Sequence, residues 1–301
     1  MALAPIVLFV YNRLEYFLQT VQALQNNHLA EKSELFVFCD GPKSDKDMEK
    51  IRKVRKNAYN IFGFKSITII ERESNLGLSN SVISGVTEIV SKYGKAIVLE
   101  DDIVTSPYFL KFMNDALVKY AYDERILSIG ACNYFANSKK NSNTFFVIMP
   151  DCWGWAVWER SWSNFNSDGS ELYQILKGKN MLNNYNLDGT YDFEQMLIGQ
   201  IAGKIDSWNI RWYAYATIHG KLTLYPKYSL SRHIGYDASS THGGMDLSKY
   251  MKFPKKEIKI QDIIIEENVI AKKEMINSMK KIYNKKSLLS RFKISIKKVL
   301  K

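Results

Sequence analysis

The stretch Ala96-Ile97-Val98-Leu99-Glu100-Asp101-Asp102 decides the fold class, because a run of aliphatic residues ends abruptly in three carboxylates. The aliphatic run, preceded by Gly94, predicts a short buried strand. Three carboxylates are too costly to desolvate inside a strand, so they must lie at its C-terminal end. Ligands bind at that edge of open α/β sheets, and carboxylate oxygens there favour Mg²⁺ or Mn²⁺. A solvated acidic turn is the alternative interpretation.

Apolar runs and helical patterns alternate on both sides of this stretch. Further strands are predicted at residues 5–11, 34–38, 66–70, 126–129 and 222–226, and helices at 14–24, 45–60, 82–90 and 108–122. The alternation predicts a mainly parallel sheet, whose strands end in polar clusters along one edge. The sequence contains neither a dinucleotide-binding glycine fingerprint nor a P-loop. Bound phosphates would therefore need another counter-charge, which a metal on the acidic triplet would supply.

Length and charge narrow the class of protein further. The chain has 301 residues, 46% of them hydrophobic, which is enough for one large domain or two small ones. We expect no signal peptide or membrane span, and the three separated cysteines fit free thiols in a reducing cytoplasm. Residues 271–301 hold eleven Lys or Arg and one acid, so the rest carries about +1 of the total +11. This distribution argues against a uniformly basic nucleic-acid binder.

Aromatic residues crowd the second half of the chain. Four of the six tryptophans lie within residues 153–162, and the Trp153-Gly154-Trp155 sequence predicts a turn that exposes a ring face to a sugar. Trp158 and Trp162 stand at helical spacing, and for them a position in the hydrophobic core is as good an interpretation as a contact with a sugar. A Gly/Ser/His loop at residues 232–244 could order over a bound ligand, and its His242 could supply a late metal or phosphate contact. Plain solvation of that histidine is the alternative.

Seven motifs in this order resemble bacterial GT-A-fold sugar transferases of surface-polysaccharide synthesis. They are Val10-Tyr11-Asn12-Arg13, Asp40-Gly41, Asn75-Leu76-Gly77, Glu100-Asp101-Asp102, Trp153-Gly154-Trp155, Asp206-Ser207-Trp208 with Arg211-Trp212, and His233-Ile234-Gly235 with Thr241-His242. The order is also similar to N-acetylglucosaminyltransferase I, whose metal motif is Glu-Asp-Asp. The resemblance covers about residues 4–244.

This resemblance implies an α/β fold of the GT-A class, with a mainly parallel Rossmann-like sheet, a mixed acceptor-binding half and a helical basic tail. Residues 1–132 would bind the nucleotide sugar, residues 133–250 would bind the acceptor, and residues 251–301 would form a basic C-terminal extension. The implied activity is a metal-dependent inverting glycosyltransfer from a nucleotide-diphosphate sugar, with a UDP-sugar favoured. The implied acceptor is a hydroxyl of a glycan or a lipid-linked acceptor.

The resemblance also assigns roles to individual residues. Asp102 would bind Mn²⁺ or Mg²⁺ directly, with His242 as a second contact. The donor would contact Tyr11, Arg13, Asp40, Asn75, Glu100 and Asp101, with Arg13 and Asp40 on the base and ribose, and Glu100 and Asp101 on the donor sugar and ribose. The acceptor would lie against Trp153, Gly154, Trp155, Trp208 and Arg211.

The catalytic base would be Asp206. The Trp-Asp-Asp-Trp motif of the eukaryotic enzyme is not conserved in this chain, because Asn209 follows Trp208. Asp192, Glu194 and Asp151 are therefore held in reserve as the base. The residue type and position of Asp192 favour a helix N-cap over catalysis.

The basic tail is a separate prediction. From Tyr283 to Lys301 apolar residues recur at helical spacing among seven cations, a pattern typical of helices that lie on anionic membranes. It suits a cytoplasmic enzyme held peripherally on the inner face of the cell membrane, and a solvated helix is the alternative. Two other functions stay open. One is a sugar-1-phosphate nucleotidylyltransferase, which would need a glycine-rich basic loop near residue 10, and the other is a non-catalytic nucleotide- or carbohydrate-binding protein.

Overall fold

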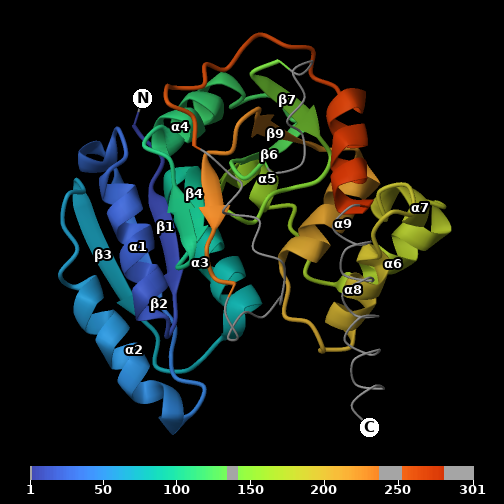
Figure 1. Cartoon of the computed structure of the whole chain (residues 1–301). Helices are drawn as coiled ribbons and strands as arrows, with labels where there is room; N and C mark the ends of the chain where they lie inside the picture. Colours follow the sequence, from blue (N-terminus) through green and yellow to red (C-terminus); the bar gives the residue numbers. More distant parts are fainter. Residues whose placement is uncertain (1, 134–141, 237–252, 281–301) are drawn as a thin grey trace, which may run out of the picture.

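The computed structural model describes residues 2–133, 142–236 and 253–280. A mixed eight-stranded sheet forms its centre (Figure 1). In spatial order the strands are β3 (Ser66–Glu71), β2 (Glu34–Cys39), β1 (Ile6–Val10), β4 (Lys95–Glu100), β8 (Trp155–Trp158), β6 (Ile126–Gly130), β9 (Leu222–Pro226) and β7 (Thr144–Val147). The first four are parallel, and the antiparallel β8 joins them to the second half. The predicted α/β class with a mainly parallel sheet is confirmed.

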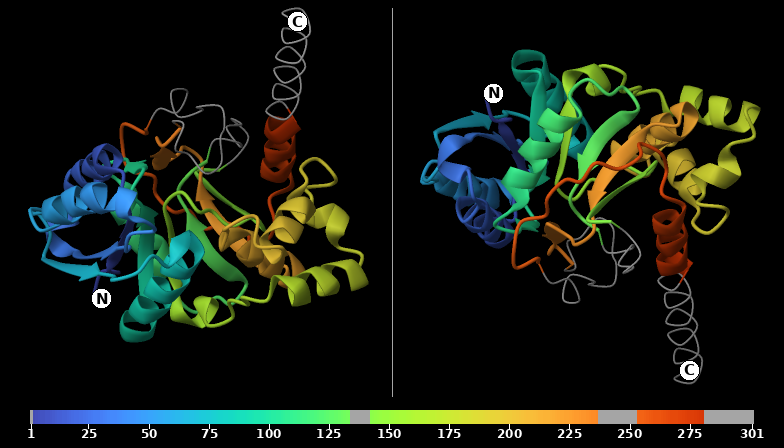
Figure 2. Two further views of the ribbon diagram at one scale, coloured as in Figure 1. Left: turned by 90° about the horizontal axis from the view of Figure 1, so that it is seen from below. Right: turned by 90° about the horizontal axis from the view of Figure 1, so that it is seen from above.

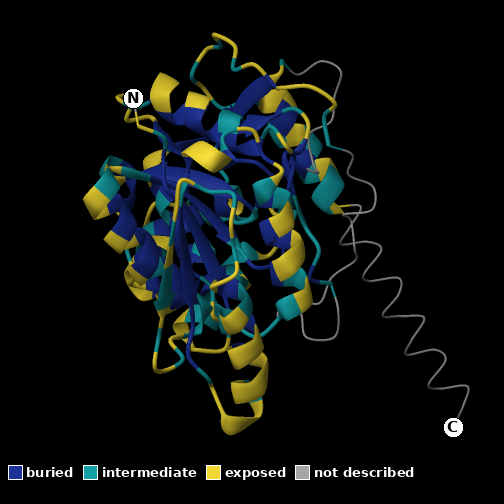
Figure 3. Ribbon diagram, turned by 90° about the vertical axis from the view of Figure 1, so that its left-hand side faces the viewer, coloured by how far each residue is buried: buried dark blue, intermediate teal, exposed yellow. Residues whose placement is uncertain are grey.

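Helices cover both faces of the sheet because residues in its strands alternate between two apolar clusters. Ile6 and Leu8 join one cluster, whereas Val7 and Phe9 join the other, as the two-residue period of a strand requires. The first face is covered by α1 (Leu14–Gln25), α2 (Asp45–Ala58) and α4 (Phe109–Lys119), and the second by α3 (Gly77–Tyr93), α5 (Glu159–Trp162) and α9 (Asn209–His219). Figure 3 shows the buried strands between helices whose outer surfaces are exposed.

A third apolar cluster lies beside the sheet. It is formed by α6 (Gly169–Gly178), α7 (Leu182–Tyr185), α8 (Phe193–Ile201) and the flank of α9. The carboxylate of Asp192 accepts a hydrogen bond from the Gln195 N–H, so the predicted N-cap is confirmed. The helical spacing proposed for Trp158 and Trp162 is wrong in part, because Trp158 ends β8 and only Trp162 is helical. Both tryptophans are buried in the core.

A small second sheet joins the two halves next to the acidic triplet. In it β5 (Ile103–Thr105) pairs antiparallel with β10 (Ser231–His233), so His233 lies opposite Ile103. The Ile234 N–H continues the contact by donating to the main-chain oxygen of Asp102. Residues that are 130 positions apart in the sequence therefore meet at the end of β4.

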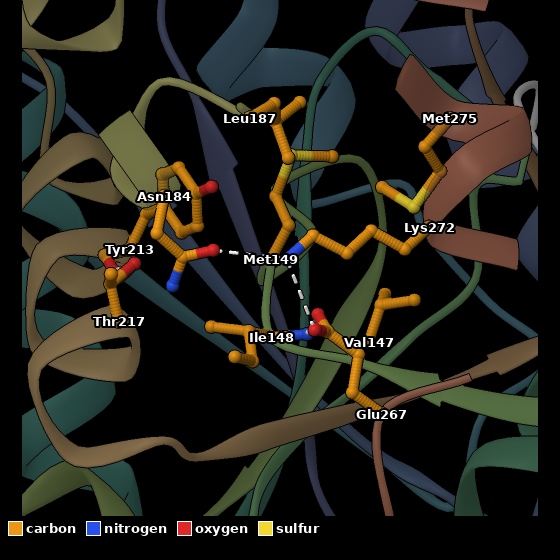
Figure 4. A pocket seen from close by; sticks show the side chains of 10 residues that line it. All are labelled: Val147, Ile148, Met149, Asn184, Leu187, Tyr213, Thr217, Glu267, Lys272 and Met275. Atoms are coloured by element: carbon orange, nitrogen blue, oxygen red, sulfur yellow. Dashed lines mark hydrogen bonds and ion pairs between the residues drawn. The ribbon is translucent and has the colours of Figure 1, made fainter. Parts of the chain in front are cut away.

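The C-terminal segment 253–280 passes over the outside of α4 and ends as a helix beside β7 (Figures 1 and 2). The hydroxyl of Tyr108 donates to the main chain of Lys255, and the Asn268 N–H donates to the oxygen of Phe146, on the edge strand. Lys272 then bridges Asn184 and Glu267 at 2.9 and 3.2 Å, as Figure 4 shows. This segment therefore covers the outer edge of the sheet, which is otherwise open to pairing with another chain.

Across the described part of the chain, no helix combines the length and the apolarity that crossing a bilayer requires. The predicted amphipathic helix at 283–301 lies outside the described residues, as does the loop at 239–244 with His242. The three cysteines are free, as expected from their number and spacing.

Candidate active site

A cavity of about 490 Å³ opens at the C-terminal ends of the parallel strands. Its walls come from both halves of the chain. The residues that line it are Phe9, Val10, Tyr11, Asn12, Arg13, Phe38, Asp40, Lys43, Asn75, Gly77, Leu78, Ser81, Glu100, Asp101, Asp102, Cys152, Trp153, Asp206, Ser207, Trp208, Asn209 and His233. Ten of the fourteen residues predicted for the site are among them. The cavity thus lies where the sequence placed a nucleotide site.

The acidic triplet is a buried part of the cavity wall, with Asp101 and Asp102 at most 4% exposed. The Nη2 atom of Arg13 lies 2.6 Å from Oδ1 of Asp101 and 2.7 Å from Oδ2 of Asp102. His233 approaches from β10, with its Nε2 atom 3.0 Å from the same Oδ2 of Asp102. The other oxygen of Asp102, Oδ1, is buried and has no hydrogen-bond partner among the described residues. A buried carboxylate oxygen without a partner is what an absent cation would leave.

The triplet holds more negative charge than Arg13 neutralises. Burial first, and then the carboxylates of Asp102 and Asp101, raise the pKa of Glu100 to about 8. Burial also raises the pKa of Asp101 to about 6, against the lowering effect of Arg13. Burial opposes ionisation of Asp102 too, but contacts with His233 and Arg13 outweigh it and lower the pKa of Asp102. A divalent cation would offset the repulsion between carboxylates that adds to burial in raising the pKa values of Glu100 and Asp101.

On the wall that the first half of the chain forms, Asp40 connects the end of β2 to the turn that follows β3. Its carboxylate accepts hydrogen bonds from the N–H groups of Gly41 and Leu76 and from the amide of Asn75, at 2.9–3.0 Å. The hydroxyl of Tyr11 accepts from the N–H of Lys43, which lies in the turn after β2. Tyr11, Arg13, Asp40 and Asn75, which were predicted as donor contacts, are therefore neighbours on one wall.

From the second half of the chain, Asp206 lines the cavity and lies against the first turn of α3. Its Oδ2 atom accepts a hydrogen bond from the Leu78 N–H at 2.9 Å, and the Ser79 N–H lies 3.3 Å from Oδ1. Gly77 has a φ of +76°, and a Cβ atom there would lie 2.9 Å from Oδ2 of Asp206. Only glycine therefore fits both the backbone and the close approach of this carboxylate.

The three reserve acids lie elsewhere and have structural partners. Asp151 is buried, and it accepts hydrogen bonds from the N–H groups of Ala131, Cys132 and Trp153. Burial raises the pKa of Asp151 to about 6 despite these donors. Asp192 caps α8, and Glu194 accepts from the hydroxyl of Tyr173. Among the lining residues, Asp206 is the acid that comes from the second half of the chain.

The predicted acceptor platform needs correction. Trp155 does not expose a ring face, because it is 1% exposed and stacks on Trp208 with ring centroids 4.7 Å apart. Arg211 is also buried and donates to the oxygen of Ser167. Gly154 adopts a φ of +92° with the side chain of Ser231 against it, so it forms a turn and does not line the cavity.

Two tryptophans remain at the cavity, to different extents. Trp208 lines the cavity but is only 2% exposed. Trp153 is half-buried, lines the cavity and stacks on His233 with centroids 5.1 Å apart. Stacking of a sugar on Trp153 stays a prediction. The other residues predicted to bind the acceptor, Gly154, Trp155, Trp208 and Arg211, are buried and do not extend an exposed platform beside it.

Sequence reasoning missed two residues of the cavity, His233 and Lys43. His233 was quoted in the His-Ile-Gly motif but not selected, and only the long-range pairing of β10 with β5 brings it to Asp102. Lys43 follows Pro42 in the turn after β2, and no pattern singled it out. His242, selected as a metal contact, lies outside the described residues. Among those residues, no group of three His, Cys, Asp or Glu side chains has the arrangement of a metal cage.

The mixed sheet, with a cavity at the carboxyl ends of its parallel strands and an acidic triplet in the cavity wall, is consistent with the GT-A class of sugar transferases. The chain belongs to the glycosyl transferase family 2, because the sequence profile of that family matches residues 6–175, which is more than half of the chain. The family match favours a glycosyltransferase over a nucleotidylyltransferase. No curated protein matches the chain.

Among the solved structures that resemble the chain at low identity are a mannosyltransferase and a fragment of TarS. One is the mannosyltransferase PcManGT from Pyrobaculum calidifontis in complex with GDP-Man and Mn²⁺, at 9% identity and a TM-score of 0.39, covering 71% of this chain and 73% of that one. The other is residues 1–349 of TarS from S. aureus, at 10% identity and a TM-score of 0.41, covering 75% of this chain and 59% of that one. Neither likeness bears on the donor, metal or acceptor of this chain.

Proposed function

We propose that the chain is a metal-dependent inverting glycosyltransferase that uses a nucleotide-diphosphate sugar, with a UDP-sugar favoured. The observation that carries this proposal is the charge of the cavity. Four aspartates line it together with Glu100, whose raised pKa favours its neutral acid, against the cations Arg13 and Lys43 among the described residues. A diphosphate would be repelled from such a wall unless a divalent ion lay between them.

The residues at the end of β4 fit that ion. Asp102 has a buried oxygen without a partner, and His233 lies against the other oxygen. We propose that Asp102 binds Mn²⁺ or Mg²⁺, with His233 as a candidate second ligand in addition to the earlier candidate His242. When bound, the ion would neutralise the charge that develops on the departing diphosphate.

The chain's own residues would hold the donor and move one proton. Arg13, Asp40 and Asn75 would fix the nucleotide, while Glu100 and Asp101 would contact the ribose and the donor sugar. The acceptor oxygen would form a bond to the anomeric carbon as the bond to the diphosphate breaks, and the acceptor proton would pass to Asp206. This single displacement inverts the anomeric centre and needs no carboxylate nucleophile, unlike a retaining hydrolase.

We also propose the division of labour along the chain. Residues 1–132 would bind the nucleotide sugar, 133–250 the acceptor, and 251–301 would form a basic extension. The acceptor would be a glycan or a lipid-linked sugar in surface-polysaccharide synthesis. Within the acceptor half, Trp153 is the aromatic residue whose position at the cavity suits stacking on a sugar.

A binding and turnover assay tests the core of this proposal. With Mn²⁺ present, a UDP-sugar at about 100 times its Kd should stabilise the folded protein by about 2.7 kcal/mol, because it binds the native state alone. The same mixture should show slow release of nucleoside diphosphate, measured by chromatography, and chelation should abolish both effects. Stabilisation that survives chelation, without any diphosphate release, would identify a non-catalytic binding protein instead.

The basic tail supports a second, separable proposal, that the enzyme docks on an anionic membrane from the cytoplasmic side. Ala271 and Met275 are buried against β7 and β9, so a truncation after Lys280 keeps the described helix docked. That truncation removes eight Lys or Arg and no acid.

We expect the full chain, but not the truncated one, to sediment with vesicles that contain phosphatidylserine, because each basic residue near such a surface contributes about 1 kcal/mol. Neutral phosphatidylcholine vesicles are the control and should bind neither form. Equal binding of both forms to the anionic vesicles would reject the membrane role.

A further inference from the structure

We propose that Arg13 is an internal counter-ion that a divalent cation displaces from Asp102, and that the freed guanidinium then binds the donor diphosphate. This inference rests on the proposed function, and it goes beyond it by giving Arg13 a different role in each state of the site. The resemblance had implied contacts between Arg13 and the base and ribose of the nucleotide.

The first step is that Arg13 already fills the role of a cation. One of its nitrogens, Nη2, lies within 2.7 Å of both Asp101 and Asp102, whose side chains are almost fully buried. A guanidinium stays protonated in proteins, so Arg13 supplies a permanent positive charge between the two carboxylates. Without this contact two buried carboxylates would face each other with no counter-ion from the first half of the chain.

The second step is that Arg13 and a metal ion would compete for the same carboxylate. Oδ2 of Asp102 already contacts both Arg13 and His233. The backbone at Gly235 also lies against this pair, since a Cβ atom there would lie 2.8 Å from Nη1 of Arg13 and collide with Oδ2 of Asp102. A divalent ion on Asp102 would therefore bring its charge close to the guanidinium, and repulsion between the two cations would push Arg13 away.

The third step is that Arg13 has somewhere to go. Its side chain is 25% exposed, and it lines the cavity together with Lys43. A guanidinium released from two carboxylates can pair with two phosphate oxygens, because its planar donors match phosphate as well as carboxylate. Metal and diphosphate would then enter together, and neither would bind strongly alone.

The test measures Mn²⁺ binding without any donor, by electron paramagnetic resonance titration of the free ion. Arg13→Gln should bind Mn²⁺ at least about tenfold more tightly than the unchanged protein, because the competing charge is gone. The same variant, saturated with Mn²⁺, should bind UDP at least about tenfold more weakly by calorimetry. If Arg13 serves first the carboxylates and then the diphosphate, the affinities for Mn²⁺ and for UDP change in opposite directions. A general loss of structure would weaken both.

Two further variants keep the test decisive. Arg13→Lys retains the positive charge and should bind Mn²⁺ within about threefold of the unchanged protein, so it reports on the charge if Arg13→Gln folds poorly. Arg52→Gln removes an exposed arginine of α2 and is the matched control, with both affinities unchanged.

The outcomes separate this inference from the proposed function. If the unchanged protein binds Mn²⁺ and Asp102→Asn does not, but Arg13→Gln binds it no more tightly, the counter-ion role is wrong and the metal site stands. If no form binds Mn²⁺, both proposals are overturned.

Discussion

Replacing Asp102 with asparagine is expected to abolish metal-dependent transfer and to lower kcat/KM by at least ~10³-fold. The ion would lose its carboxylate charge, and stabilisation of the departing diphosphate is worth several kcal/mol, at about 1.4 kcal/mol for each factor of ten. Asparagine keeps the shape of the side chain, so Arg13 retains Asp101 and the fold should persist. The measurement is the rate of donor turnover as a function of Mn²⁺ concentration.

Asp115→Asn is the matched control for this substitution. Asp115 is a half-exposed carboxylate of α4 that pairs with Lys111 and does not line the active-site cavity. Its replacement should leave the Mn²⁺ dependence unchanged, since exposed ion pairs contribute little. Transfer by Asp102→Asn that persists after chelation would show that the acidic triplet does not act through a metal.

Replacing Asp206 with asparagine is expected to lower the rate of transfer by about 10²–10⁴-fold while donor binding stays within about twofold. The amide oxygen can still accept the Leu78 N–H, so the first turn of α3 should keep its place. The acceptor hydroxyl would lose the group that takes its proton. The measurements are the rate of transfer and the Kd for the donor, both on the same preparation of the variant.

Asp206→Ala separates catalysis from anchoring. It removes both N–H contacts at α3, and loss of such a cap costs about 1 kcal/mol of stability. If Asp206 only anchors the helix, Asp206→Asn will be nearly as active as the unchanged protein and only Asp206→Ala will be impaired. Asp192→Asn, at the cap of α8 and outside the cavity, is the control and should leave transfer unchanged.

Patterns within short windows predicted the first half of the fold well. The apolar runs that contain Ile6–Val10 and Leu35–Phe38 are strands because both of their faces are buried, and a buried parallel strand leaves a continuous apolar run. The four-residue strands β7 and β8 were missed, since four residues carry too little periodicity to separate a strand from a helix. The tryptophans in and after β8 then suggested a helix where the chain is partly extended.

The part of the candidate site that lies at the end of a single strand could be predicted from the sequence. Glu100, Asp101 and Asp102 follow one another at the end of β4, so the burial of β4 alone locates them. The exposure of Trp155 was predicted wrongly because its partner Trp208 lies more than fifty residues away. His233 was missed for the same reason, since only the pairing of β10 with β5 brings it to Asp102. Contacts between distant segments depend on the whole topology and leave no local pattern.

The unbroken sheet has a consequence for engineering this enzyme. Main-chain pairing between β4 and β8 crosses the boundary between the two proposed halves, with Lys95 opposite Trp158 and Val98 opposite Trp155. A recombinant chimera that takes its acceptor half from another transferase would have to reproduce this register, because a shift of one residue would turn Trp155 away from its apolar cluster to the opposite face of the sheet, where the small Ala156 packs. New acceptor preferences are therefore easier to introduce by exchanging loops around the cavity than by exchanging the half as a module.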